Sequence, residues 1–207
     1  MTGVEVLGTP FSNFVRAVRM VLEEKGVAYT LNPCRPHTTE IDAIHPMGKI
    51  PCFKHGDFTL FESVAIARYV DSTFTGPRLF PAEPKAAALV DQWTSFVNST
   101  LMSAFHTYLV AYVFPRTSDG KPDRAAINSV LPQAEAHLRL LDGRVGATGY
   151  LAGDSFSYAD INAMTILAYL HDLPETGALM KELPSLATYY AAHAERASFK
   201  ATIPPPR

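Results

Sequence analysis

The amino-acid sequence predicts an α+β protein of two domains, with a β-α-β then β-β-α order in the first and only helices in the second. Short β-prone runs alternate with helical patterns as far as residue 74. A segment rich in proline and glycine follows, and long stretches of helical spacing fill the rest of the chain. With 207 residues, each part is large enough to bury a core of its own.

The first predicted unit is a parallel β-α-β. Val4 to Leu7 is a short β-prone run that ends in the turn sequence Gly8-Thr9-Pro10. From Phe14 onward apolar residues recur every three or four positions, which predicts a helix that stops at Lys25-Gly26. Val27 to Leu31 is the second predicted strand. Because a single helix separates the two strands, a right-handed crossover makes them parallel.

A hairpin and a third element complete the first predicted domain. Residues 50–54 and 58–61 are β-prone runs on either side of His55-Gly56-Asp57, and residues 62–74 have helical spacing. One glycine and three prolines then fall within residues 75–84, namely Gly76, Pro77, Pro81 and Pro84. We therefore predict a first domain over 1–76, a linker over 77–84 and a second domain over 85–207.

The second domain is predicted to be all helical, with helices over about 85–113, 123–142 and 157–171 and a weaker one ending near 195. One helix start is well defined by its residues. Ser157 can cap the helix while Asp160 takes the N3 position, which is a capping-box arrangement. We interpret this pair as structural and not catalytic.

Composition excludes several classes of protein. A formal net charge of −2 and a pI near 6.4 give no cationic field for nucleic acid. Cys34 and Cys52 form neither a disulfide framework nor a zinc-ligand spacing, so we expect no metal and a reducing compartment. No basic stretch leads into an apolar run at the N-terminus, and no run approaches the ~18 apolar residues that span a bilayer. A cytoplasmic protein without a membrane segment is expected.

Three short motifs in the first domain are candidate parts of a functional site. Ser12 lies just before the first helix, where a hydroxyl can bond an anion held by the helix N-terminus, although a serine there is more often a simple cap. Glu62-Ser63 starts the next predicted helix and offers the same alternatives. Lys49-Ile50-Pro51 stands at the mouth of a strand, and by itself it is an ordinary strand-start proline.

A fourth motif is aromatic and belongs to the second domain. Its residues have mostly helical spacing, which is more often typical of a core than of a binding surface. They are Phe105, Tyr108, Tyr112 and Phe114.

In combination the motifs resemble the cytosolic glutathione transferases from end to end. The resemblance is carried by five stretches, namely Gly8 to Asn13 with Arg16-Ala17-Val18, Leu22 to Val27, His45 to Pro51, Leu60 to Ile66 and Phe156 to Ile161. It implies a thioredoxin-like first domain that binds glutathione, an all-helical second domain that binds a small hydrophobic electrophile, and a homodimer. Ser12 matches the catalytic serine of the serine-type classes, closest to phi and delta or theta.

The resemblance also implies roles for further residues. Ser12 would stabilise the glutathione thiolate, and the co-substrate would be held by Ile50 with a cis bond to Pro51, by Glu62 and Ser63, and at its glycine carboxylate by His37 and Lys49. The walls of the electrophile site would be Phe11, Asn13, Phe105, Tyr108, Tyr112 and Phe114. Asp91 is a possible contribution from a partner subunit. The implied activity is detoxifying conjugation of glutathione to hydrophobic electrophiles.

Other functions stay open for such a sequence. The same activated thiolate could reduce peroxides, remove halogens or cleave ethers. The fold could also serve as a non-catalytic carrier of apolar ligands, because a fold does not fix a function. A thiol-disulfide oxidoreductase needs a low-pKa cysteine at the start of the first helix, where this chain has Ser12.

Overall fold

The computed structural model of the protein describes residues 3–115 and 117–206. The chain divides into two compact units, of which the first joins Met1–Pro81 with Ala194–Arg207 and the second is Ala82–His193. The change from one unit to the other falls inside the predicted linker. The last residues of the chain, which the sequence pattern placed with the helical domain, belong to the first unit.

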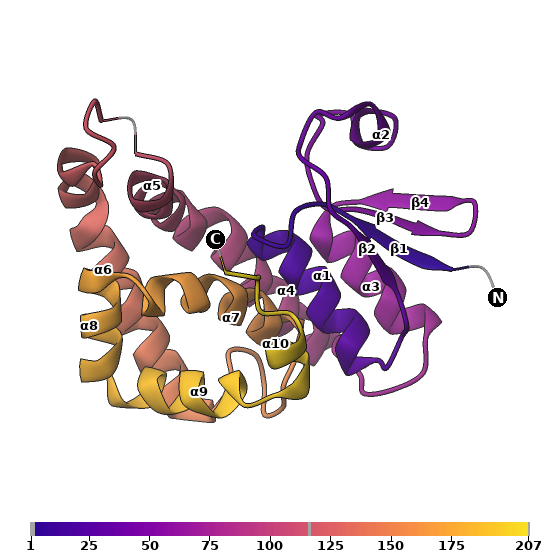
Figure 1. The fold of residues 1–207 in the computed structure, drawn as a ribbon. Coiled ribbons are helices and arrows are strands. Elements are labelled where there is room, and N and C mark those ends of the chain that lie inside the picture. The colour runs from indigo at the N-terminus through magenta and orange to yellow at the C-terminus, as the bar shows by residue number, and fades with distance from the viewer. Residues whose placement is uncertain (1–2, 116, 207) are drawn as a thin grey trace. The chain divides into compact units, whose positions relative to one another are not determined.

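The first unit is built on a four-stranded mixed sheet of order β2-β1-β3-β4 (Figure 1). β1 pairs in parallel with β2, whereas β3 pairs antiparallel with both β1 and β4. The strands are β1 (Val4–Leu7), β2 (Thr30–Asn32), β3 (Cys52–His55) and β4 (Phe58–Phe61). The predicted β-α-β then β-β-α order is confirmed, apart from one short helix between β2 and β3 that the sequence pattern did not predict. β2 begins later than predicted because the Val27 N–H bonds back to the Leu22 carbonyl and so ends the preceding helix.

The two faces of this sheet are covered differently. Helices α1 (Asn13–Glu24) and α3 (Ser63–Thr73) pack side by side, and α3 brings Tyr69 against Phe53 of β3 (Figure 1). The short helix α2 (Thr39–Asp42), which the sequence pattern did not predict, places Ile41 with the paired residues Leu7 and Cys52. These contacts fix the loops at the end of the sheet where the predicted site residues lie.

The C-terminal segment of the chain packs on α1. Helix α10 (Ala197–Ala201) is held by Arg16, whose guanidinium donates to the Phe199 carbonyl at 3.1 Å and lies over the Phe199 ring. Glu24 accepts two hydrogen bonds from Arg196, at 2.8 and 2.7 Å. This segment therefore completes the core of the first unit (Figure 1).

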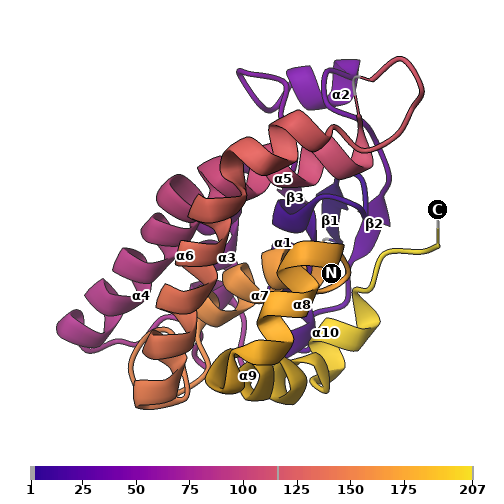
Figure 2. The same cartoon turned by 90° about the vertical axis from the view of Figure 1, so that its left-hand side faces the viewer.

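All regular secondary structure in the described residues of the second unit is helical (Figure 2). Its helices are α4 (Pro84–Phe96), the π-helix η1 (Val97–Leu101), α5 (Met102–Val113), α6 (Arg124–Thr148), α7 (Tyr158–His171), α8 (Pro174–Glu182) and α9 (Pro184–Ala194). The predicted helix over 85–113 is thus interrupted by one turn of wider winding. α6 runs beyond its predicted end and stops at Gly149, which has a left-handed φ of 77°.

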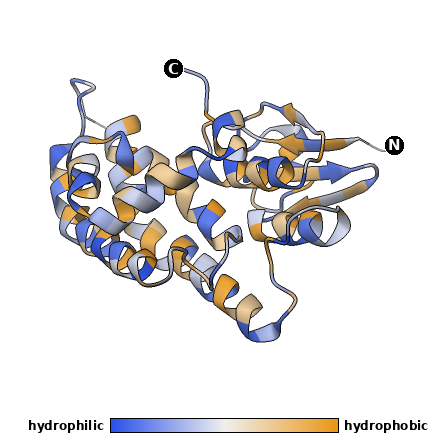
Figure 3. Cartoon of the chain, turned by 90° about the horizontal axis from the view of Figure 1, so that it is seen from below, coloured by the Kyte–Doolittle hydropathy of each residue, from blue (hydrophilic) through white to orange (hydrophobic). Residues whose placement is uncertain are grey.

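Most helices carry both apolar and polar residues (Figure 3). α7 differs because it is buried along most of its length. Its predicted capping box is confirmed: the Ser157 N–H and hydroxyl both donate to Asp160 Oδ2 at 2.9 Å. In the described part of the chain, no helix has the length and apolar character needed to cross a membrane.

Candidate active site

The loop between β1 and α1 lies close to the Ile50-Pro51 segment. Gly8 has a φ of 149°, and a Cβ there would lie 2.5 Å from Val15 Cγ2 and 3.1 Å from Ile50 Cβ. Only glycine combines this backbone conformation with such a close approach. The glycine therefore allows the loop that carries Ser12 to pack beside Ile50.

Ser12 caps α1 and still retains a hydroxyl proton. Its Oγ accepts the Val15 N–H at 3.3 Å, which uses one oxygen lone pair, and the side chain is half-exposed. Accepting a bond leaves the Ser12 O–H able to donate. The first turn of α1 contains no acidic residue, so the positive end of the helix dipole is not opposed there. Capping and anion binding are therefore compatible roles for this serine.

The Ile50-Pro51 peptide bond is cis, as the resemblance implied. The Ile50 side chain packs against a buried cluster of Leu7, Ile41 and Cys52. Among the described residues, neither the N–H nor the C=O of Ile50 forms a hydrogen bond. A peptide laid alongside Ile50 could therefore pair with both groups, as an added strand does.

Glu62 and Ser63 form an open helix N-terminus. Glu62 has a φ of 67°, which is unusual for a residue with a long side chain, and it precedes α3 without a side-chain cap bond. Its carboxylate is 70% exposed, while Ser63 is buried at the first position of the helix. The first N–H groups of α3 are therefore available to a carboxylate, with the Glu62 carboxylate beside them for a cationic group.

His37 and Lys49 lie at the two ends of the segment that contains α2. The His37 N–H donates to the Gly48 carbonyl at 2.9 Å, and its ring lies 3.6 Å from Asp42 Oδ1. A Cβ at Gly48 would lie 2.2 Å from His37 Nδ1, so this glycine is required for the loop to close. Lys49 is exposed and forms no ion pair with the described residues. Both side chains can thus turn toward an anion.

His45 is a site residue that the sequence analysis missed. It is buried, its ring lies tilted against the Phe61 ring with the centroids 4.7 Å apart, and its Nδ1 accepts the Met47 N–H at 3.0 Å. In the neutral imidazole this bond places the proton on Nε2, which lies 3.9 Å from Glu62 Oε1. That distance is too long for a hydrogen bond but short enough for electrostatic attraction. The position of His45 just before Gly48 and Pro51 was the available clue.

Phe11 and Asn13 flank Ser12. Phe11 is half-buried, and its N–H donates to Thr9 Oγ1 at 3.4 Å. The Asn13 Nδ2 atom is buried and has no hydrogen-bond partner among the described residues. An unpaired amide donor next to Ser12 is costly unless a ligand accepts its hydrogen bond.

The four aromatic residues predicted as walls in the second unit lie in different environments. Phe105 and Tyr108 are buried, Tyr112 is half-buried, and Phe114 at the end of α5 is 69% exposed. Phe114 lines a cavity of about 240 Å³ between α5 and the start of α6. That these four residues form walls of an electrophile site therefore stays a prediction.

The hydroxyls of Tyr108 and Tyr112 are engaged by Glu175. Both donate to Glu175 Oε2, the first at 2.7 Å, and Arg124 donates to Glu175 Oε1 at 2.6 Å. Burial opposes ionisation of Glu175, but these hydrogen bonds outweigh it and lower the pKa of its carboxyl to about 2. The network joins α5, α6 and α8, so these hydroxyls are structural.

Neither cysteine is placed as a reactive thiolate. Both are free thiols, and burial raises the pKa of Cys34 and raises that of Cys52 to about 11. A thiol-disulfide oxidoreductase requires the opposite shift. Across residues 3–115 and 117–206, no group of three or more His, Cys, Asp or Glu side chains could hold a metal ion.

Two family models match the chain. The glutathione S-transferase N-terminal domain matches residues 6–78, and the glutathione S-transferase C-terminal domain matches residues 124–192. The curated protein glutathione S-transferase 4 of Zea mays is 32% identical over 201 residues, which cover 93% of this chain and 88% of that protein.

Solved structures agree with these matches. Poplar glutathione transferase F1 has a TM-score of 0.88 at 28% identity, covering 98% of this chain and 97% of that one. The theta-class glutathione S-transferase of Xanthomonas axonopodis pv. citri, solved with glutathione bound, has a TM-score of 0.85 at 29% identity and covers 100% and 99% of the two chains. The chain therefore belongs to the glutathione S-transferase family.

Proposed function

We propose that the Ser12 hydroxyl donates a hydrogen bond to the sulfur of glutathione and holds it as a thiolate. Family membership makes the chain a glutathione transferase with glutathione as its co-substrate. The observation that carries the proposal is that Ser12 caps α1 through its oxygen alone, which leaves its proton for a ligand. The dipole of α1 favours an anion at the same place.

One hydrogen bond from Ser12 is strong enough to ionise a substantial fraction of the glutathione thiol at pH 7. A free thiol with a pKa of about 8.5 is only a few per cent ionised at pH 7. A charge-assisted hydrogen bond of about 1.5–3 kcal/mol would lower the thiol pKa by about one to two. Ser12 would then act as a stabiliser of the nucleophile and form no covalent bond with the substrate.

The rest of the tripeptide follows from the free groups of the first unit. The cysteinyl part would pair with the unbonded N–H and C=O of Ile50, beside Pro51. The γ-glutamyl carboxylate would meet Ser63 and the open N-terminus of α3, and its ammonium would meet Glu62. His37 and Lys49 would attract the glycine carboxylate.

The reaction is an attack of the thiolate on an electrophilic carbon. The sulfur electron pair forms the S–C bond, and the leaving group departs with its own electron pair or, in an addition, water supplies a proton to the adjacent carbon. We propose a small hydrophobic electrophile, held by Phe11 and Asn13 and by the four aromatic residues Phe105, Tyr108, Tyr112 and Phe114. The buried Asn13 amide would add one hydrogen-bond donor to that apolar site.

We also propose that the chain is a cytoplasmic homodimer. Two free thiols suit a reducing compartment. Asp91 lies exposed on α4, where a partner subunit could use it near the γ-glutamyl ammonium. Light scattering of the purified protein measures the mass, and a monomer at all concentrations would exclude the partner contribution.

The decisive experiment is a titration of glutathione into the purified protein, following heat of binding and thiolate absorbance against pH. We expect a micromolar to millimolar Kd and a thiol pKa below about 7.5. Ser12→Ala should keep the binding but return the thiol pKa toward about 8.5. An unchanged pKa in Ser12→Ala would refute the role of Ser12. Tight binding of apolar ligands without any affinity for glutathione would favour a carrier.

A further inference from the structure

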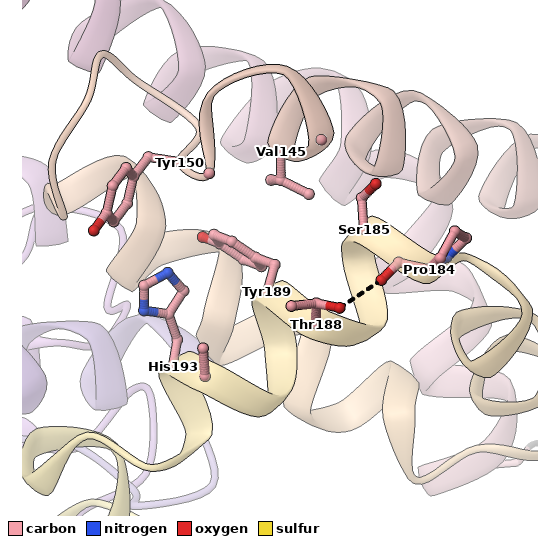
Figure 4. A pocket seen from close by; sticks show the side chains of 10 residues that line it. Val145, Tyr150, Pro184, Ser185, Thr188, Tyr189 and His193 are labelled. Carbon is pink, nitrogen blue, oxygen red and sulfur yellow. Dashed lines mark hydrogen bonds between the residues drawn. The ribbon is translucent and has the colours of Figure 1, made fainter.

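A second cavity lies wholly within the helical unit, between the end of α6 and α9 (Figure 4). Its volume is about 460 Å³, which is within the usual range for small-molecule sites. Gly146 allows α6 and α9 to approach closely, because a Cβ there would lie 2.6 Å from Ser185 Oγ. The two helices therefore approach closely at one end and leave a hollow beside the contact.

The lining of this cavity is aromatic at one end. His193, which is buried, has the Tyr189 ring at 4.5 Å, the Phe156 ring at 4.9 Å and the Tyr150 ring at 5.7 Å. Tyr150, Tyr189 and His193 gather on one side of the hollow, and Ser185 and Pro184 lie on the other (Figure 4). Rings of this kind favour a flat ligand, which can stack on them or meet their edges.

The charge of the lining restricts the ligand further. None of the ten lining residues is Asp, Glu, Lys or Arg, so a charged ligand would lose part of its hydration there without gaining a carboxylate, ammonium or guanidinium partner. Most lining surface is apolar. An uncharged ligand is therefore favoured.

The few polar groups favour a hydrogen-bond donor on the ligand. α6 ends at this cavity with Gly149, and the last carbonyls of a helix form the negative end of its dipole. Thr188 and Tyr189 are already engaged, the first with the Pro184 carbonyl and the second with Asp160. The Ser185 hydroxyl has no hydrogen-bond partner within the described part of the chain.

We propose that the cavity between α6 and α9 binds a flat, uncharged aromatic molecule that has a hydroxyl or N–H group, at a site separate from the glutathione site. Every lining residue belongs to the second unit, whereas the proposed glutathione ligands belong to the first. Neither the family assignment nor the thiolate chemistry is needed for this inference.

The test uses 1-naphthol and the purified full-length protein at pH 7, followed by calorimetry. Saturating S-hexylglutathione is added first, so that the glutathione and electrophile sites are filled. We expect one naphthol to bind per chain under these conditions. Complete displacement of naphthol by S-hexylglutathione would overturn the proposal. If S-hexylglutathione itself does not bind, the glutathione proposal fails, while the variants below still test the cavity.

Two neighbouring alanines on α9 provide a matched pair. Ala192 lines the cavity and Ala191 does not, and both are exposed, so a larger side chain is tolerated at either position. Ala192→Phe should fill part of the hollow and weaken naphthol binding by about tenfold or more, whereas Ala191→Phe should change it by less than about twofold. Equal affinities in the two variants would refute the site.

A charged probe tests the chemical class. 1-Naphthalenesulfonate has the same rings and a negative charge, and we expect it to bind at least about tenfold more weakly than 1-naphthol. Equal affinity for the two probes would overturn the inference that the ligand is uncharged.

Discussion

Two serines at the N-caps of two helices show how the same residue type serves different ends. Ser157 before α7 is buried, and both its N–H and its hydroxyl are bonded to Asp160. Ser12 before α1 is half-exposed, and the single hydrogen bond of its side chain to the described residues is the 3.3 Å bond that its oxygen accepts. A structural serine has thus used its proton within the protein, whereas a serine available for chemistry has not.

Two glutamates repeat the contrast. Glu175 accepts hydrogen bonds from two tyrosines and an arginine inside the helical unit. Glu62 keeps a mostly exposed carboxylate, and the Nε2 atom of His45 lies 3.9 Å from it. The comparison teaches that free hydrogen-bonding capacity, and not residue type, separates a binding group from a structural one.

The largest effect on stability is expected at Asp160, the hydrogen-bond partner of Ser157. Asp160 is fully buried and also accepts the Leu151 N–H and the Tyr189 hydroxyl, each at 2.9 Å. Asp160→Asn would place amide hydrogens against these donors and should lower the free energy of unfolding by about 3–5 kcal/mol. Urea denaturation measures the loss. Asp154 is exposed, so Asp154→Asn is the control. Equal stabilities of the two variants would contradict the structural role of Asp160 and of its bonds to Ser157.

The serine pair itself should separate activity from stability. Ser12→Ala removes a donor from the developing thiolate and should lower kcat/KM for conjugation by about 100-fold, with at most about 1 kcal/mol lost in stability. Ser157→Ala should instead cost about 1–2 kcal/mol in stability and leave the kinetics of the folded enzyme unchanged. Steady-state assays and urea denaturation of both variants test this prediction. If the two variants lose activity and stability to the same extent, the two serines do not have different roles.

The glutamate pair should separate in the same way. Glu62→Gln should raise KM for glutathione by about tenfold, because the γ-glutamyl ammonium loses a charged partner. Glu175→Gln should leave that KM unchanged and lower the free energy of unfolding by about 1–2 kcal/mol at pH 7. A change of KM in Glu175→Gln alone would contradict the assignment of both glutamates.

The pH dependence sharpens the Glu175 test. Its pKa is lowered from an ordinary 4.5 to about 2, so its stabilising contribution is complete above 4.5 and is lost as the pH falls toward 2. The stability difference between the wild type and Glu175→Gln should therefore shrink over that interval. A difference that stays constant down to pH 2 would contradict the proposed cause of the shift.

The smallest effect is expected at His45, which acts through Glu62 and the Met47 N–H. His45→Leu leaves that N–H without its acceptor and should raise KM for glutathione by about fivefold, with kcat less affected. His45→Asn can accept the same bond through its amide oxygen and should restore most of the affinity. If the leucine and asparagine variants bind glutathione equally, His45 has no positioning role.

The sequence by itself determined the order of the strands and longer helices in the first unit, the helical character of the second unit and the start of α7. These features depend on periodicity and on caps formed by residues three or four positions apart, which can be read from neighbouring letters. It also placed Ser12, Ile50 and Glu62 at helix and strand starts, and their combined spacing indicated the family. For a single serine, however, the sequence favoured an ordinary cap.

The tertiary structure decided which of these groups are free to act. Tyr108 and Glu175 are 67 residues apart, and Arg16 and the Phe199 carbonyl are 183 apart, so no local pattern contains their contacts. His45 follows α2 and Glu62 follows β4, so only the folding of the sheet brings these two residues to within 3.9 Å of each other. A hydroxyl or a carboxylate can form only a limited number of hydrogen bonds. If folding supplies partners for all of them, the group is structural, and if some remain unused, the group can bind a ligand.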